Sequence, residues 1–61
     1  MNHERAELID AIRAQSRSMQ DVALKMAQFA WSNQLRSLGE RSILLAQHSL
    51  DLESIAKGLE E

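Results

Sequence analysis

Two histidines and the carboxylates near them are the side chains of this sequence with the clearest chemical potential. A histidine with a carboxylate three or four positions away on a helix can help to bind a metal ion or act as a pH-sensitive switch. His48 has Asp51 three positions further on, whereas His3 lies near the start of the chain. One imidazole beside one carboxylate is too little for a metal site. We therefore interpret His48 as an interface histidine within an apolar stripe.

The sequence predicts a protein without catalytic activity. It has no paired carboxylates, no nucleophile beside a base and no glycine-rich phosphate loop. It also has no cysteine, which excludes disulfides and thiolate zinc sites. We expect no catalytic residue, no metal and no cofactor.

Nucleic-acid binding is the alternative function that the sequence leaves open. The segment 18–36 loosely resembles a helix-turn-helix, but Ala27 stands where the turn glycine would be. The formal net charge is −2, and acids lie among the arginines of the first helix. Salt-dependent binding to DNA or RNA would favour this alternative. The scattered arginines are Arg5, Arg13, Arg17 and Arg36.

Length and composition favour self-association. A chain of 61 residues buries only about 60% of the surface that its unfolded form exposes, so a stable monomer would be marginal. With disulfides excluded, oligomerisation is the simplest way to gain stability. No apolar run approaches the roughly 20 residues of a membrane span, and no signal-peptide pattern opens the chain, so we expect a cytoplasmic protein.

The chain predicts a single all-α domain over residues 1–61. It contains no proline, and its apolar residues recur three and four positions apart. Gly39 suits the left-handed position that ends a helix. The prediction is a long helix over 3–37, a turn at 38–40 and a shorter antiparallel helix over 41–58.

A break near Ser16–Ser18 is the alternative within the first helix. Serine is a mediocre helix former, and Ser18 with Asp21 resembles a capping box. A break there would give a three-helix bundle, with helices over 3–15, 19–37 and 41–58.

Both helices are apolar on two sides near the turn, which predicts two partners for each. In the first helix one stripe follows a heptad spacing, and a neighbouring seam broadens it. A second stripe lies on the far side. The simplest closed solution is a homodimer in which two hairpins form a four-helix bundle. The first stripe runs through Leu8, Ile12, Met19, Val22, Met26 and Phe29, the neighbouring seam through Ile9, Ile12, Ser16, Met19, Ala23, Met26 and Ala30, and the second stripe through Leu24, Trp31 and Leu35.

Six apolar residues are the predicted dimer or partner interface. Phe29 and Trp31 are the only Phe, Trp or Tyr residues, and they point to nearly opposite sides of one helix. Tryptophan is favoured at interface hot spots. The predicted interface residues are Leu24, Phe29, Trp31, Leu35, Ile43 and Leu50.

The layout of two heptad helices joined by a turn at Leu38–Gly39–Glu40 resembles the Rop family of plasmid copy-number proteins. It also resembles short accessory proteins of lambdoid phage early regions. The first resemblance implies a hairpin that dimerises into a four-helix bundle, and the second implies a regulatory role through host or phage proteins. Rop-like RNA binding would imply a lysine-bearing face on the first helix, where this sequence has only Lys25, near Asp10 and Asp21.

Overall fold

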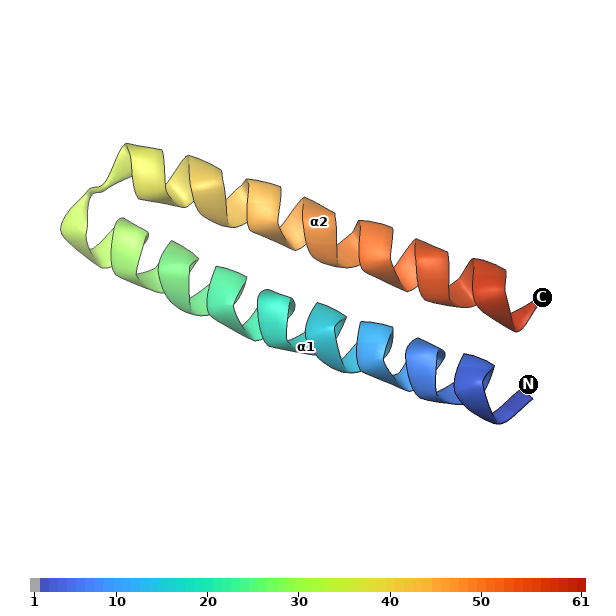
Figure 1. Ribbon diagram of the computed structural model, residues 1–61. Helices are drawn as coiled ribbons and strands as arrows, with labels where there is room; N and C mark the ends of the chain where they lie inside the picture. The colour runs from blue at the N-terminus through green and yellow to red at the C-terminus, as the bar shows by residue number, and fades with distance from the viewer. Residues whose placement is uncertain (1) are drawn as a thin grey trace.

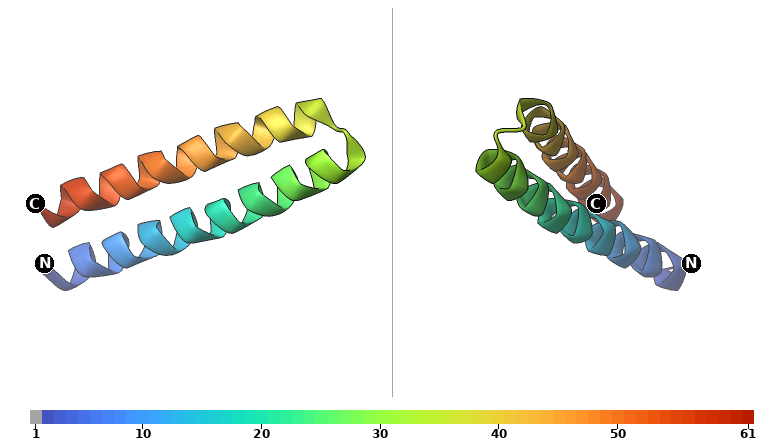
Figure 2. Two further views of the ribbon diagram at one scale, coloured as in Figure 1. Left: turned by 180° about the vertical axis from the view of Figure 1, so that it is seen from behind. Right: turned by 90° about the vertical axis from the view of Figure 1, so that its left-hand side faces the viewer.

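Two antiparallel helices make up the fold. A computed structural model describes residues 2–61, which form α1 (Asn2–Asn33) and α2 (Arg36–Glu60). The helices lie side by side along a rod 48 Å long, with both ends of the chain at the end opposite the turn (Figures 1 and 2). The described residues contain no strand, so the predicted all-α hairpin is confirmed. Neither helix of the described chain is long and apolar enough to cross a membrane.

The helix α1 is continuous through Ser16–Ser18, as predicted, so the alternative of a break and a three-helix bundle is wrong. Serine weakens helices when its hydroxyl competes for the local backbone. Here the Ser16 hydroxyl instead donates to the carbonyl oxygen of Ser49 on α2, at 2.8 Å. The tertiary contact therefore outweighs the modest helix propensity of serine.

The turn lies at Gln34–Leu35, which corrects the predicted turn at 38–40. The backbone amide of Leu35 donates to Ala30 O at 2.9 Å, and that of Gln34 approaches Trp31 O at 3.5 Å. Gln34 has a φ of 56°, in the left-handed region. This is the bonding pattern of a Schellman motif, in which a left-handed residue ends the helix. Gln34 therefore takes the left-handed, helix-ending role that the sequence predicts for Gly39.

Gly39 is an ordinary helical residue of α2 because the turn comes five residues earlier. Its amide donates to Leu35 O at 3.0 Å, which is the first helical bond of α2. Its φ is not positive. The earlier start makes α2 25 residues long, so it covers most of α1. Ile12 is accordingly half-buried, although Leu8 remains 51% exposed.

Replacing Gly39 with alanine should stabilise the protein. A Cβ at this position would meet the Ala30 Cβ at 3.8 Å, which is ordinary van der Waals contact. Alanine is favoured over glycine within a helix by about 0.8–1 kcal/mol. We expect Gly39→Ala to raise the free energy of unfolding by this order, measured by urea denaturation. Destabilisation by Gly39→Ala would instead indicate a left-handed residue 39 and a turn at 38–40.

Gln34 is the position where glycine should help. A left-handed conformation costs a non-glycine residue roughly 1–2 kcal/mol, and Gln34 adopts it. Gln34→Gly should therefore raise the midpoint of urea denaturation, and Gln34→Val should lower it because a β-branched residue resists positive φ. Equal midpoints for the two variants would contradict the observed turn.

Candidate interaction surfaces of the hairpin

The interior of the hairpin is built from small side chains. Six of the described residues are buried, and each helix contributes three of them at intervals of seven. An interval of seven keeps residues on one side of a helix that faces another helix. We call this set the small-residue seam; it consists of Ser16, Ala23 and Ala30 on α1 and Ser42, Ser49 and Ala56 on α2.

A hydrogen bond across the seam shows how closely the two backbones approach. The Ser16 hydroxyl reaches a main-chain oxygen of the other helix, that of Ser49, at 2.8 Å. A side chain with one heavy atom beyond Cβ can do this only where the neighbouring helix is very near. Ser42 and Ser49 turn their own hydroxyls back to carbonyls of α2, those of Gly39 and Ala46, each at 2.6 Å. No buried side-chain nitrogen or oxygen of the described residues lacks a partner.

A row of polar contacts runs along one edge of the seam. The Gln20 amide donates to Ser16 Oγ at 3.2 Å and to Glu53 Oε1 at 3.0 Å. Further toward the chain ends, Arg13 and Glu60 form an ion pair. Gln20 and Glu53 each follow a bonded seam serine by four positions. Residues that follow the seam by one or four positions therefore lie on the same face of the hairpin in both helices.

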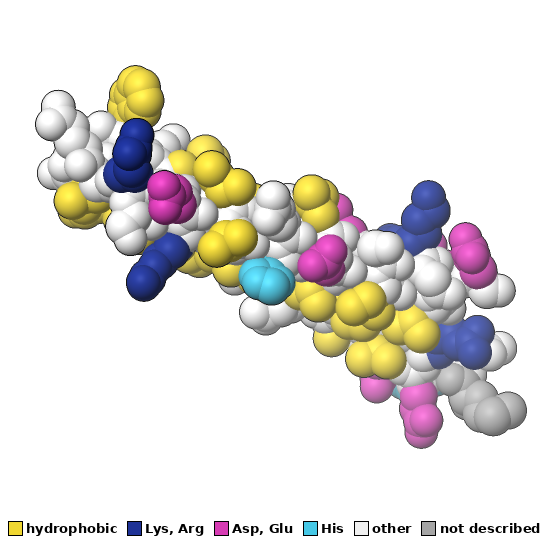
Figure 3. All heavy atoms as spheres, turned by 90° about the horizontal axis from the view of Figure 1, so that it is seen from above, with side chains coloured by type: hydrophobic (Ala, Val, Ile, Leu, Met, Phe, Trp, Pro, Cys, Tyr) yellow, Lys and Arg dark blue, Asp and Glu magenta, His cyan; other side chains and the backbone are white. Residues whose placement is uncertain are grey.

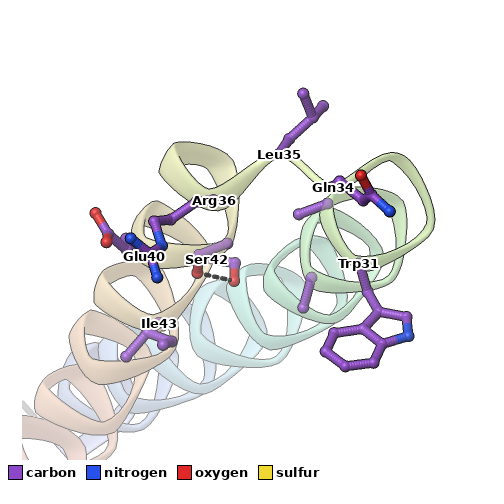
Figure 4. Close-up of a pocket in the computed structure, with 10 residues that line it drawn as sticks. Trp31, Gln34, Leu35, Arg36, Glu40, Ser42 and Ile43 are labelled. Atoms are coloured by element: carbon purple, nitrogen blue, oxygen red, sulfur yellow. Dashed lines mark hydrogen bonds between the residues drawn. The ribbon is translucent and has the colours of Figure 1, made fainter.

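The first face, which we call the Trp31 face, contains the residues that come one position after each seam residue. Its apolar members lie in the half nearer the turn, and the indole of Trp31 extends away from the helix pair (Figure 4). Trp31 is 88% exposed. A shallow cleft beside it is lined by Ala27, Ile43 and residues of the turn. The other half of this face is charged, with Arg13, Arg17, Glu53, Lys57 and Glu60 around a second cleft. The large apolar members are Leu24, Trp31, Ile43 and Leu50.

The second face, which we call the large-residue face, lies on the other side of the seam. It contains the positions that precede the seam by one, such as Val22, Phe29 and Ile55, which are 45–58% exposed. It also contains the positions three after seam positions, which are half-buried except for Asn33. Hydrophobic side chains follow one long edge of the molecule for most of its length and the other edge mainly near the turn (Figure 3). The half-buried members are Ile12, Met19 and Met26 on α1 and Leu45, Leu52 and Leu59 on α2.

The structure divides the six predicted interface residues between surfaces. Phe29 belongs to the large-residue face, and Leu24, Trp31, Ile43 and Leu50 belong to the Trp31 face. Leu35 projects from the turn, pointing away from Trp31 (Figure 4). All six are exposed, from 43% for Leu35 to 88% for Trp31. Whether they form an interface stays a prediction.

The residues of α1 that close the hairpin are only the small members, Ser16, Ala23 and Ala30, of the seam that broadens the heptad stripe in the sequence. The heptad stripe from Leu8 to Phe29 was expected to meet a partner helix, and one apolar stripe was expected to lie inside the hairpin. Neither large stripe is the interior, because alanine and serine fill it. The available signal was the recurrence of small residues every seven positions in both helices, at 16, 23 and 30 and at 42, 49 and 56.

His48 lies exposed on the large-residue face, one position before Ser49. Within residues 2–61, no three His, Cys, Asp or Glu side chains are grouped so that they could hold a metal ion. The segment that loosely resembles a helix-turn-helix is helical from Ser18 to Asn33. The tight turn that such a motif requires is therefore replaced by continuous helix.

Comparison with protein families, with curated proteins and with solved structures found no match to this chain. Its interaction surfaces must therefore be interpreted from their own chemistry.

Enlarging a seam residue should be far more damaging than enlarging an exposed alanine. Ala23 is 5% exposed within the seam, and extra methylenes in a close-packed interior cost about 1–3 kcal/mol. Ala23→Leu should lower the free energy of unfolding by this amount or more, measured by urea denaturation. Ala14→Leu, at an exposed position of the same helix, is the matched control and should change it by less than about 0.5 kcal/mol. Equal tolerance of both substitutions would refute a close-packed seam.

Proposed function

We propose that this protein is a small non-enzymatic regulatory protein that acts through protein–protein contacts as a homodimer. The observation that carries the proposal is that small side chains fill the interior of the hairpin while large hydrophobic side chains lie on its surface. The buried residues among those described are alanines and serines, while ten large hydrophobic side chains are 43–88% exposed. Burying apolar surface provides the main driving force of folding. A substantial part of that driving force is therefore still available to a partner.

The total exposed surface supports the same proposal. A compact folded monomer of 6.9 kDa exposes roughly 4000 Å² by the usual scaling of surface with mass. The hairpin exposes 5009 Å². The excess of about 1000 Å² is close to the roughly 800 Å² that each partner buries in a standard protein interface.

The proposed mechanism is occupancy, in which a helical surface covers a groove or helix of a target protein. A role of the kind implied by the resemblance to plasmid and phage accessory hairpins, in the cytoplasm, is part of this proposal. Basic side chains give less support to nucleic-acid binding, because Arg13 is paired with Glu60 and Lys25 with Asp21 at 3.0 Å. A nucleic-acid footprint requires a patch of cations free to meet phosphates.

Sedimentation equilibrium over a wide concentration range tests the homodimer. We expect a mass of twice 6.9 kDa at micromolar concentration and a fall toward the monomer mass on dilution. The same samples, titrated with duplex DNA and with RNA hairpins at low salt, should show no salt-dependent binding. A folded monomer at every concentration would overturn the proposal, and salt-dependent nucleic-acid binding would favour the alternative.

A further inference from the structure

We propose that the second copy covers the large-residue face and leaves the Trp31 face in water. This inference rests on the proposed homodimer and names the surface through which it forms. Both faces are apolar near the turn, so the choice between them depends on how far each apolar surface extends and how it joins the hairpin interior.

The apolar part of the large-residue face extends from Leu8 to Phe29 along α1, whereas the large apolar residues of the Trp31 face lie only in the half nearer the turn. On α1, the positions of the large-residue face from Leu8 to Phe29 include no charged residue, and on α2 the one Lys, Arg, Asp or Glu is Arg41, near the turn. On the Trp31 face, the half nearer the chain ends carries five charged side chains, from Arg13 to Glu60. Charged residues are depleted from the centres of interfaces, because removing them from water is costly. A partner of the same length as the hairpin therefore fits the large-residue face.

The large-residue face also joins directly to the interior of the hairpin. Ile12, Met19 and Met26 lie three positions after successive seam positions, and they are half-buried by α2. Each therefore contributes to the hairpin interior with one part of its side chain and to the open face with the other. Helices of four-helix bundles have this property, because each packs against two neighbours. The Trp31 face instead has alanine at the positions that adjoin the seam, Ala27 and Ala46, and its large side chains project outward.

The area of the face is sufficient for a stable dimer. A partner that overlapped the whole rod would make contact over a length of 48 Å, and two helices side by side are about 20 Å wide. Such a face would bury on the order of 900 Å² per copy, which falls in the range of specific protein interfaces. This is also close to the excess surface of the hairpin. A second copy presents the same face to the first, as a two-fold interface requires.

Two of the polar residues of this face have a consistent place in such a dimer. Gln15 and His48 each precede a serine of the bonded pair Ser16–Ser49 by one position, so they lie at the same level of the rod, near its middle. In a fully overlapping dimer the equivalent residues of both copies meet at that level. A polar layer in an otherwise apolar helical interface fixes the register of the partners.

Two substitutions of matched exposure separate the faces. Phe29 on the large-residue face is 58% exposed, and Leu50 on the Trp31 face is 59% exposed. Both are helical, and both are open to water in the single hairpin. We expect Phe29→Glu to weaken dimerisation by at least about a hundredfold, because it places a carboxylate in the covered face. Leu50→Glu should change the dissociation constant by less than about threefold. Circular dichroism of both variants reports whether the hairpin still folds.

Trp31 provides a second measurement that needs no substitution. It is the one tryptophan of the chain. In the dimer its emission should be that of an indole in water, and acrylamide should quench it as readily as in the diluted protein. This readout stays informative even if Phe29→Glu fails to fold, because it uses the unmodified chain.

The outcomes distinguish the failure of the face assignment from the failure of the dimer. A dimer that Leu50→Glu dissociates and Phe29→Glu does not, or in which Trp31 emission shifts to the blue and resists acrylamide, overturns the face assignment alone. A wild-type chain that stays monomeric at all concentrations overturns the homodimer itself.

Discussion

The close approach of two helix backbones, marked by the hydrogen bond from Ser16 Oγ to Ser49 O, is the constraint on which the rest of this structure depends. At such a separation the space between the helices admits only alanine and serine. Leucine, isoleucine, methionine and phenylalanine must then lie at the edges or outside. The hairpin gains packing density along the seam, but it buries little apolar area. Exposure of large hydrophobic side chains is therefore a direct result of the way the interior is built.

The turn follows from the same constraint. The seam pairs Ser16 with Ser49, and antiparallel helices then pair Ala23 with Ser42 and bring Ala30 close to residue 35. The chain must therefore reverse direction immediately after Asn33. Only a two-residue connection fits, and Gln34 adopts a left-handed conformation to make it. A suitable glycine is present at position 39, but the interhelical pairing decides where the chain turns.

The helices and their antiparallel arrangement could be predicted from heptad spacing and the absence of proline. The position of the turn could not, because local preference pointed to Gly39 while the deciding contact joins residues 33 positions apart. The alternative of a break at Ser16–Ser18 arose for a similar reason, since propensity describes an isolated helix and not one with an acceptor on its neighbour. The apolar surfaces were found from the sequence, because large side chains dominate any hydrophobicity pattern. The seam was given less weight, because alanine and serine contribute little to such a pattern.

The even spacing of the seam also means that it does not by itself define one alignment of the helices. Sliding α2 by seven residues would place Ala56 opposite Ser16, Ser49 opposite Ala23 and Ser42 opposite Ala30, again small against small. The two-residue turn forbids this slip within one chain, and the Gln20–Glu53 bond would be lost in it. The turn does not impose this limit when two chains exchange their second helices, because α1 of one chain then packs against α2 of the other. The short connection at Gln34–Leu35 therefore fixes the alignment of the helices within one hairpin, whereas chains that exchanged their second helices could adopt the slipped pairing.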